Sequence, residues 1–229
     1  MKIYAMSDIH GCLYALNEAL DLFVEKLEED DTKLIFLGDY VHGGEDNRGV
    51  LDKIISLQNK YGDDKVIALM GNHDLWVIEG RSTIDKMIAS TNDDDVMGDS
   101  IYYSFIDSLP YYHIEGNTIF VHAGINEQAG EYWEWDTSEK IMTMKYPPDI
   151  GQVEGITEKI VAGHVGTSDI TNDRYFHDIY YDGYSHYYID GTVLDSGVIP
   201  VLMVDTETDT YYRVSECGNI LISPYNDDN

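Results

Sequence analysis

The sequence predicts an α/β protein with two β-sheets, and three observations lead to this fold class. Strand-like apolar runs alternate with segments of helical apolar spacing through residues 3–70, which is typical of a largely parallel sheet with right-handed crossovers. After residue 164 strand-like runs and turn residues predominate, which predicts a second, mixed or antiparallel sheet. With 229 residues, 43% of them hydrophobic, the chain is expected to form one domain, 1–229, with a sizeable core.

Strand–helix units open the chain. The strands are expected at residues 3–6, 33–37 and 65–70, each a mainly apolar run. From Leu13 to Leu27 apolar side chains recur at three- and four-residue spacing, and a second such pattern covers residues 50–58. Both patterns predict a helix that packs one face on the first sheet.

Residues 80–110 break this alternation. They combine a short helical pattern, the acidic and turn-rich segment 91–95 and aromatic side chains at 102–105. We expect either an inserted cap or lid that selects substrate, or a solvated surface excursion. Two strands then flank a turn at 115–117, and a helix is expected at 131–145. Further strands are predicted at 175–181, 187–189, 198–204 and 210–214.

The composition argues against nucleic acids and membranes as partners of this chain. Fourteen Lys and Arg against 43 Asp and Glu give a formal net charge of −29, which repels phosphate backbones, so bulk nucleic-acid binding is not expected. The sequence shows no membrane-spanning apolar run and no leader-like N-terminus, and the two cysteines, Cys12 and Cys217, are too few and too ordinarily spaced to indicate a disulfide framework or a thiolate metal site. We therefore expect a cytoplasmic protein that does not bind membranes. No sequence pattern indicates an oligomeric state.

Five short polar motifs occur along the chain, several of them directly after apolar runs. They are Ser7-Asp8-Ile9-His10-Gly11, Gly38-Asp39, Gly71-Asn72-His73-Asp74, Val121-His122-Ala123-Gly124 and Gly163-His164. Carboxylate, imidazole and amide groups without a thiolate suit Mn, Fe, Zn or Mg. Six such side chains exceed the needs of one ion, whereas two ions about 3.5–4 Å apart that share a carboxylate would use them all in phosphoryl displacement. Phosphate ester hydrolysis is the predicted chemistry.

The order and glycines of these motifs, from Asp8 to about Asp190, resemble the calcineurin-like metallophosphoesterases, and within them the bacterial branch of the phosphoprotein phosphatase family, which includes serine/threonine phosphatases and diadenosine tetraphosphatases. The resemblance implies an αββα fold, a two-sheet β-sandwich flanked by helices, and two divalent metal ions. Mn²⁺ is the expected ion, with Fe, Zn or Mg as alternatives. The implied ligands are Asp8 and His10 on the first ion, Asp39 between the two, and Asn72, His122 and His164 on the second.

The resemblance also implies roles beside the metal ligands. His73 would be the general acid that protonates the leaving group, and Asn72 would also contact the substrate. Asp74 and Asp190 are candidates to orient site histidines. The histidines outside the motifs are expected to be structural: His113, His177 and His186.

The second motif departs from the family pattern at two positions. The family has an aspartate where this chain has His42, and an arginine where it has Gly43. Without the carboxylate the acid function of His73 is weakened, and without the arginine a two-pronged grip on phosphate is lost. His42 has three open interpretations, a hydrogen bond to the substrate, an added metal ligand or a plain loop histidine. Arg48 either reaches the substrate or forms a surface ion pair.

Three functional hypotheses follow. The main one is metal-dependent hydrolysis of phosphate monoesters, on a phosphoprotein or a small phosphometabolite, by a metal-activated water. The first alternative is a phosphodiesterase or dinucleoside polyphosphate hydrolase, because a monoanionic group needs less clamping than the lost arginine would provide. The second alternative is a metal-binding regulatory protein with reduced catalysis.

Overall fold

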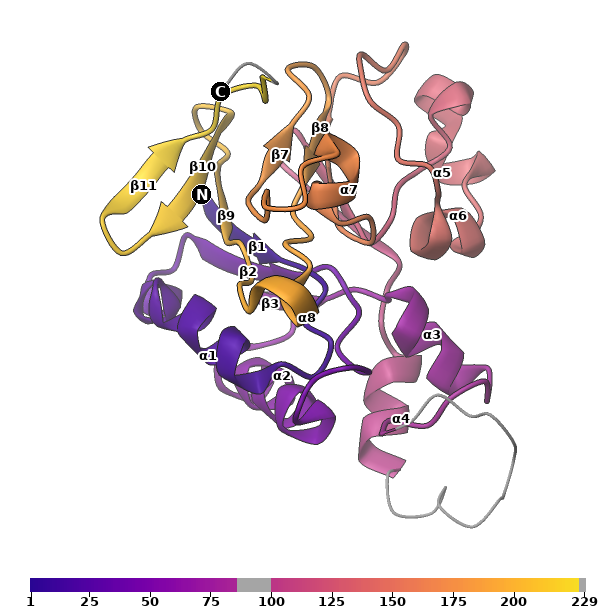
Figure 1. Ribbon diagram of the computed structural model, residues 1–229, viewed down its shortest axis with the longest axis vertical. Helices are drawn as coiled ribbons and strands as arrows, with labels where there is room; N and C mark the ends of the chain where they lie inside the picture. The colour runs from indigo at the N-terminus through magenta and orange to yellow at the C-terminus, as the bar shows by residue number, and fades with distance from the viewer. Residues whose placement is uncertain (86–99, 227–229) are drawn as a thin grey trace.

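The computed structural model describes residues 1–85 and 100–226 and contains two β-sheets packed face to face, with helices on the outer sides (Figure 1). Within these residues the first sheet has six strands in the order β11-β10-β9-β1-β2-β3, and the second has five in the order β4-β5-β6-β8-β7. The predicted two-sheet sandwich flanked by helices is confirmed.

Most of the elements are short. The first sheet consists of β1 (Lys2–Met6), β2 (Thr32–Phe36), β3 (Val66–Ala68), β9 (Leu202–Asp205), β10 (Thr210–Ser215) and β11 (Gly218–Leu221). The second sheet consists of β4 (Tyr112–Glu115), β5 (Thr118–Val121), β6 (Lys159–Ala162), β7 (Tyr180–Tyr181) and β8 (His186–Tyr188). The α-helices are α1 (Leu13–Asp21), α2 (Asn47–Tyr61), α3 (Asn72–Ile78), α4 (Ser100–Asp107), α5 (Trp133–Asp136), α6 (Glu139–Met144), α7 (Thr167–Thr171) and α8 (Val193–Ser196), and the 3₁₀-helices are η1 (Val24–Glu28) and η3 (Glu127–Tyr132).

Alternation along the strands shows how the layers pack. On β1, Ile3 and Ala5 belong to the core between the sheets, while Tyr4 and Met6 belong to the core that also contains residues of α1 and α2. On β5, Phe120 enters the same inter-sheet core from the other side. The central strands are therefore buried on both faces, as parallel strands usually are.

The central strands of both sheets run parallel. β1 pairs with β2 and β2 with β3 in parallel register, and the same holds for β5 with β6 and β6 with β8. The carboxyl ends of parallel strands meet at one edge of a sheet, where α/β proteins build binding sites. The loops after these strands are therefore the place to look for a site.

Two of the predicted helices are shorter than their apolar patterns. α1 ends at Asp21 because Phe23 leaves the helical conformation, with φ −151°, and stacks on Tyr4 of β1 at 4.2 Å between ring centroids. The helix predicted at 131–145 is divided, since the Ser138 side chain caps a new helix by accepting from Ile141 N.

The turn pattern predicted that the C-terminal strands would form the second sheet, and only some of them do. β7 and β8 do, but β9 pairs antiparallel with β1, and β10 and β11 extend the first sheet from there. The open edge of β1 accepts them, so the first sheet is mixed rather than purely parallel.

The segment predicted as a cap or lid, 80–110, is described only at its two ends, since residues 86–99 lie outside the described part of the chain. Its ends belong to the main core, because Ile84 and Ile106 are completely buried there and α4 packs beside α3 (Figure 1). The lid role stays a prediction. Among the described helices, none combines the length and the apolar character needed to cross a membrane.

Candidate metal centre

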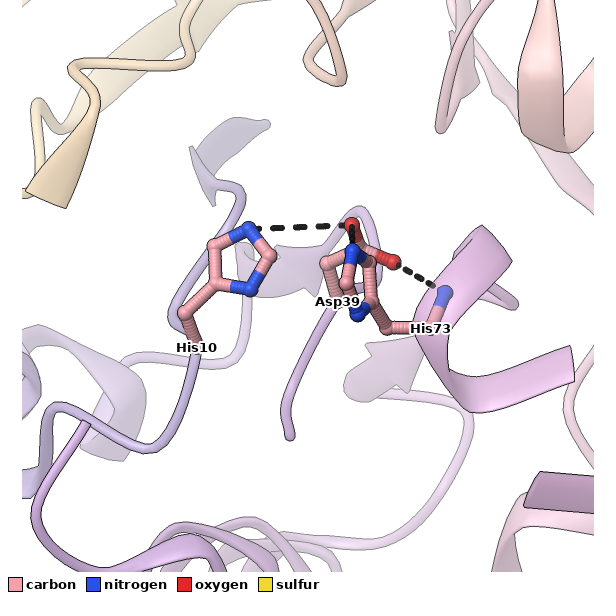
Figure 2. Close-up of side chains that lie close together, drawn as sticks. All are labelled: His10, Asp39 and His73. Carbon is pink, nitrogen blue, oxygen red and sulfur yellow. Dashed lines mark hydrogen bonds and ion pairs between the residues drawn. The ribbon is translucent and has the colours of Figure 1, made fainter. Parts of the chain in front are cut away.

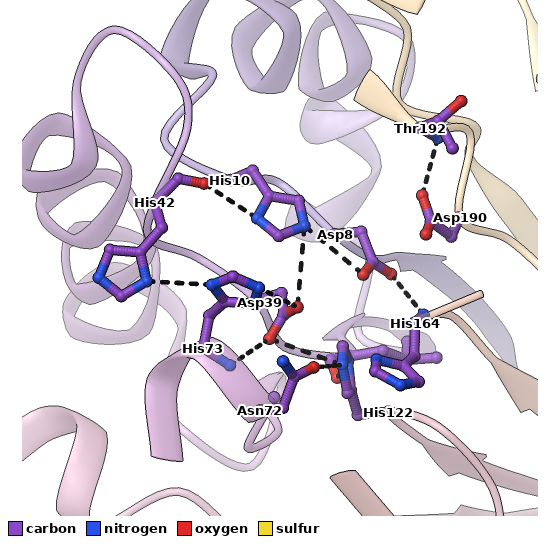
Figure 3. A network of polar contacts seen from close by, with 12 residues as sticks. Asp8, His10, Asp39, His42, Asn72, His73, His122, His164, Asp190 and Thr192 are labelled. Carbon is purple, nitrogen blue, oxygen red and sulfur yellow. Dashed lines mark hydrogen bonds and ion pairs between the residues drawn. The ribbon is translucent and has the colours of Figure 1, made fainter. Parts of the chain in front are cut away.

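The side chains of the five motifs converge at one edge of the sandwich (Figure 3). Asp8 and Asp39 lie in the loops that follow β1 and β2, and His122 and His164 lie in those that follow β5 and β6. Asn72 begins α3, a short loop after β3. Both sheets therefore contribute to one site through the carboxyl ends of their parallel strands.

The loops that carry these residues have an uncommon backbone. The φ angle is 53° at Asp8, 50° at His10, 56° at Asp39 and 65° at His164. Such left-handed residues cost about 1–3 kcal/mol each and persist only where neighbours enforce the conformation. Here backbone bonds enforce it, as Asp8 N donates to Gly38 O at 3.1 Å and His10 N to Asp39 O at 2.8 Å. Strain concentrated in one cluster of loops marks a functional site.

Asp39 is the centre of the cluster. Its Oδ2 lies 3.7 Å from His10 Nε2 and 4.0 Å from His73 Nε2, and its Oδ1 lies 3.5 Å from His122 Nε2 (Figure 3). Burial opposes ionisation of this carboxyl, but the positive charge that His122, His10 and His73 supply when protonated outweighs burial and lowers its pKa below the ordinary value. Asp39 is thus a buried carboxylate with one oxygen toward each half of the cluster.

His122 presents a nitrogen lone pair to two oxygen atoms. Its Nδ1 lies 3.1 Å from Leu37 O, a carbonyl that only accepts, so Nδ1 carries the proton. In the neutral ring Nε2 is then unprotonated, and it faces Asn72 Oδ1 at 3.0 Å and Asp39 Oδ1 at 3.5 Å. Lone pairs that converge in a buried position repel one another unless a cation lies among them. The donor set therefore fits a metal ion.

His10 repeats this arrangement on the other side of Asp39. Its Nδ1 donates to His42 O at 3.0 Å, and its Nε2 faces Asp39 Oδ2 at 3.7 Å and Asp8 Oδ1 at 3.9 Å. Burial lowers the pKa of His10, but Asp39 and Asp8 outweigh it and the pKa is raised overall. This position therefore also attracts positive charge.

The donor atoms form two groups that share Asp39. His10, Asp39 and His73 each offer one donor atom within 4.8 Å of the others (Figure 2), and Asp39, His122 and His164 do the same. Two groups joined by one carboxylate suit two neighbouring divalent ions. The residues present fit the pair of metals that the sequence predicts.

Two further carboxyls brace the loops. Asp74, expected to orient a histidine, instead accepts from the backbone N–H groups of Asp39 at 2.7 Å, Tyr40 at 3.1 Å and Gly71 at 3.1 Å. Burial, and next the charge of Asp39, raise the pKa of Asp74 to about 7. Asp190 accepts from Thr192 N at 2.7 Å, and burial and then Asp8 raise its pKa. Asp74 therefore acts on the backbone of the site loops, and Asp190 on the residue before α8.

His42 and His73 lie against each other beside the first group. Their Nδ1 atoms are 3.1 Å apart, and His42 Nε2 lies 2.7 Å from Thr83 O (Figure 3). Burial lowers the pKa of His42, and it lowers that of His73 to about 4 against the attraction of Asp39. Both ring nitrogens of His42 therefore lie against protein atoms, His73 Nδ1 and Thr83 O.

The remaining predicted residues lie at the edge of the site. Arg48 donates to Asp85 Oδ2 at 2.9 Å and lies 5.7 Å from the Tyr102 ring centroid, as the surface ion-pair interpretation expects. Gly43 has φ 118°, and a Cβ there would lie 2.6 Å from Leu194 Cδ1. Leu194 therefore fills the space in which a side chain at position 43 would begin. Sequence reasoning missed both Leu194 and Thr83, because neither belongs to a motif.

Comparison with known proteins identifies a family and several relatives that this chain resembles. A family model described as calcineurin-like phosphoesterase matches residues 1–199. The chain is 31% identical over 128 residues to the symmetrical bis(5'-nucleosyl)-tetraphosphatase of Nitrosospira multiformis, a match covering 55% of this chain and 44% of that protein. It is 30% identical over 154 residues to the protein of the same name from Janthinobacterium sp., covering 65% and 53%. The chain thus spans about half the length of these curated relatives.

Solved structures share the fold. A cold-active protein-tyrosine phosphatase of Shewanella sp. superposes with a TM-score of 0.67 at 14% identity, covering 97% of this chain and 80% of that one. A protein serine/threonine phosphatase from Saccharomyces cerevisiae gives a TM-score of 0.57 at 14% identity, covering 99% and 82%. At such low identity these likenesses show the fold alone.

Proposed function

Since the chain belongs to the calcineurin-like phosphoesterase family, and is therefore a phosphoester hydrolase, we propose that it cleaves dinucleoside polyphosphates with two divalent metal ions. The observation that carries the proposal is the pair of donor groups joined by Asp39. The named activity of the curated relatives supports this substrate class over the phosphate monoesters that the sequence alone put first. A cytoplasmic enzyme with a small phosphoester substrate and no nucleic-acid partner is part of the proposal.

The proposed ligand assignment keeps to the motif residues. Asp8, His10 and Asp39 would hold one ion, and Asp39, Asn72, His122 and His164 the other. Two such ions, when bound, neutralise phosphoryl oxygens and make a water molecule nucleophilic near neutral pH. We propose Mn²⁺, with Fe, Zn or Mg as alternatives, because the set of imidazole, carboxylate and amide groups is hard to borderline.

The surroundings of Asp39 favour a substrate with little charge on each phosphate. Position 43 has no side chain, and Leu194 covers it, so no guanidinium from this position grips a terminal dianion. The inner phosphates of a dinucleoside polyphosphate carry one negative charge each and need less clamping.

The test is a substrate comparison with the metal-stripped chain reloaded with Mn²⁺. Diadenosine tetraphosphate, p-nitrophenyl phosphate, bis-p-nitrophenyl phosphate and a phosphoserine peptide are compared by kcat/KM. We expect diadenosine tetraphosphate to be cleaved best, with ADP as the product. Asp39→Asn should abolish turnover, and the exposed Asp63→Asn is the matched control.

Two outcomes contradict the proposal. Monoester preference by an order of magnitude would restore the phosphatase hypothesis. Tight binding of two metals without hydrolysis of any substrate would instead favour the regulatory protein.

A further inference from the structure

A line of hydrogen bonds fixes the protons on two histidines that flank the first donor group. It runs from Thr83 O to His42 Nε2 at 2.7 Å, and from His42 Nδ1 to His73 Nδ1 at 3.1 Å. A carbonyl oxygen only accepts, so His42 Nε2 carries a proton. His42 is 7% exposed, and so buried a position disfavours a second proton on its ring. Its Nδ1 is therefore the acceptor, and His73 donates from Nδ1.

The other nitrogen of His73 then faces the metal centre without a proton. His73 Nε2 lies 4.0 Å from Asp39 Oδ2, and His10 Nε2 lies 3.7 Å from the same oxygen (Figure 2). His10 and His122 also use Nδ1 to donate to an acceptor of the protein and turn Nε2 toward Asp39. His73 thus has the same orientation as two proposed metal ligands.

We propose that His42 fixes His73 in the tautomer with its proton on Nδ1, so that His73 Nε2 is a ligand nitrogen for the metal ion held by His10 and Asp39 rather than a general acid. The inference rests on the metal centre of the proposed function. Histidine ligands characteristically donate their second N–H to a protein acceptor, and His42 is that acceptor here.

The proposal also has a consequence for the substrate. An unprotonated Nε2 gives no proton to a leaving group. A serine alkoxide needs that proton, whereas a nucleotide leaves a polyphosphate as a stable phosphate anion. A histidine at position 42 therefore matches phosphoanhydride substrates better than phosphoserine.

The first experiment reads the tautomer directly. Long-range ¹H–¹⁵N correlation spectra of the metal-free, ¹⁵N-labelled chain at neutral pH should show His73 protonated at Nδ1 only, with the signal assigned by its loss in His73→Ala. Titration with ¹¹³Cd²⁺ should then produce one-bond coupling to Nε2 of His73, as to Nε2 of His10 and His122. A proton on His73 Nε2, or coupling at His10 and His122 but not at His73, would overturn the proposal.

The second experiment removes the acceptor. His42→Leu should weaken the affinity for one of the two ions by roughly 10–100-fold in competition with a chelating dye, because the ligand ring loses the group that orients it. His113→Leu on β4 is the matched control and should bind both ions as the wild type does. Equal affinity in His42→Leu would contradict the role of His42, and the wild-type spectra decide the matter if this variant does not fold.

The two proposals fail separately. Cleavage of dinucleoside polyphosphates without cadmium coupling at His73 would keep the function and remove this ligand. Coupling at His73 without that cleavage would keep His73 as a ligand and remove the proposed function.

Discussion

At the scale of single residues, the metal centre depends on a carboxylate that is not itself a proposed ligand. Asp74 is completely buried and accepts from three backbone N–H groups, two of them at Asp39 and Tyr40. These bonds keep the loop after β2 in its left-handed conformation at Asp39. The position of Asp39, the proposed shared ligand, therefore depends on the hydrogen bonds that the Asp74 carboxylate accepts.

Asp74→Asn should damage this loop while preserving the shape of the side chain. The amide nitrogen would face a backbone donor, and one buried N–H would lose its acceptor, so we expect a loss of about 1–3 kcal/mol in the free energy of unfolding. Metal affinity should fall as well, since Asp39 moves with the loop. Denaturant unfolding of the metal-free chain and a metal titration check both effects. Asp63→Asn is the surface control, and unfolding energies equal to the wild type would refute the bracing role.

At the scale of elements, the sequence predicted which segments form strands and helices better than where they pair. The period of apolar residues identified the strands that lead to Asp8, Asp39 and His122, because burial on a sheet leaves a local pattern. It did not predict that β9 pairs with β1, since an apolar run carries no mark of the sheet edge it joins. Nor did it predict the partner of His42, because Thr83 lies far along the chain and offers only a backbone oxygen.

The start of α2 is an element on which the site depends. Asp46 caps the helix by accepting from Gly49 N at 2.8 Å, and the next residue, Asn47, accepts from His42 N at 2.9 Å. Asp46→Ala should lower the free energy of unfolding by about 0.5–2 kcal/mol, because the cap is lost. Thermal unfolding measures the change. Asp46→Ser keeps a capping oxygen and should stay close to the wild type, and an equal loss in both variants would rule out the cap as the cause.

At the scale of the whole molecule, a buried polar triad joins the second sheet to the helical layer outside it. His186 of β8 is 1% exposed and lies between Glu127 Oε1 at 2.9 Å and Asp182 Oδ2 at 2.7 Å. Glu127 begins η3 and also pairs with Lys145 at 3.2 Å. His186 stabilises this arrangement between two carboxylates only while its ring is protonated. The packing of this layer should therefore depend on pH.

The triad predicts a loss of stability in mild alkali. Burial lowers the pKa of His186, but the hydrogen bonds to Asp182 and Glu127 outweigh it and raise the pKa to about 9. An unfolded histidine titrates near 6.5, so the folded protein binds the proton more tightly. The resulting stabilisation, roughly 3 kcal/mol, is complete below about pH 6.5 and disappears as the pH rises through about 9. Denaturant unfolding of the metal-free chain at intervals from pH 6 to pH 9.5 should show this decline.

His186→Gln separates the triad from every other titrating group. Glutamine cannot carry the charge, so this variant should be less stable than the wild type at pH 6 and should lose the decline between pH 6.5 and 9. His113 is the matched control, because burial lowers its pKa, and His113→Gln should keep the wild-type decline. A decline that survives in His186→Gln would place the titrating group elsewhere. If the decline is absent from that variant and present in the control, the charge on His186 stabilises the packing of the outer helical layer on the second sheet.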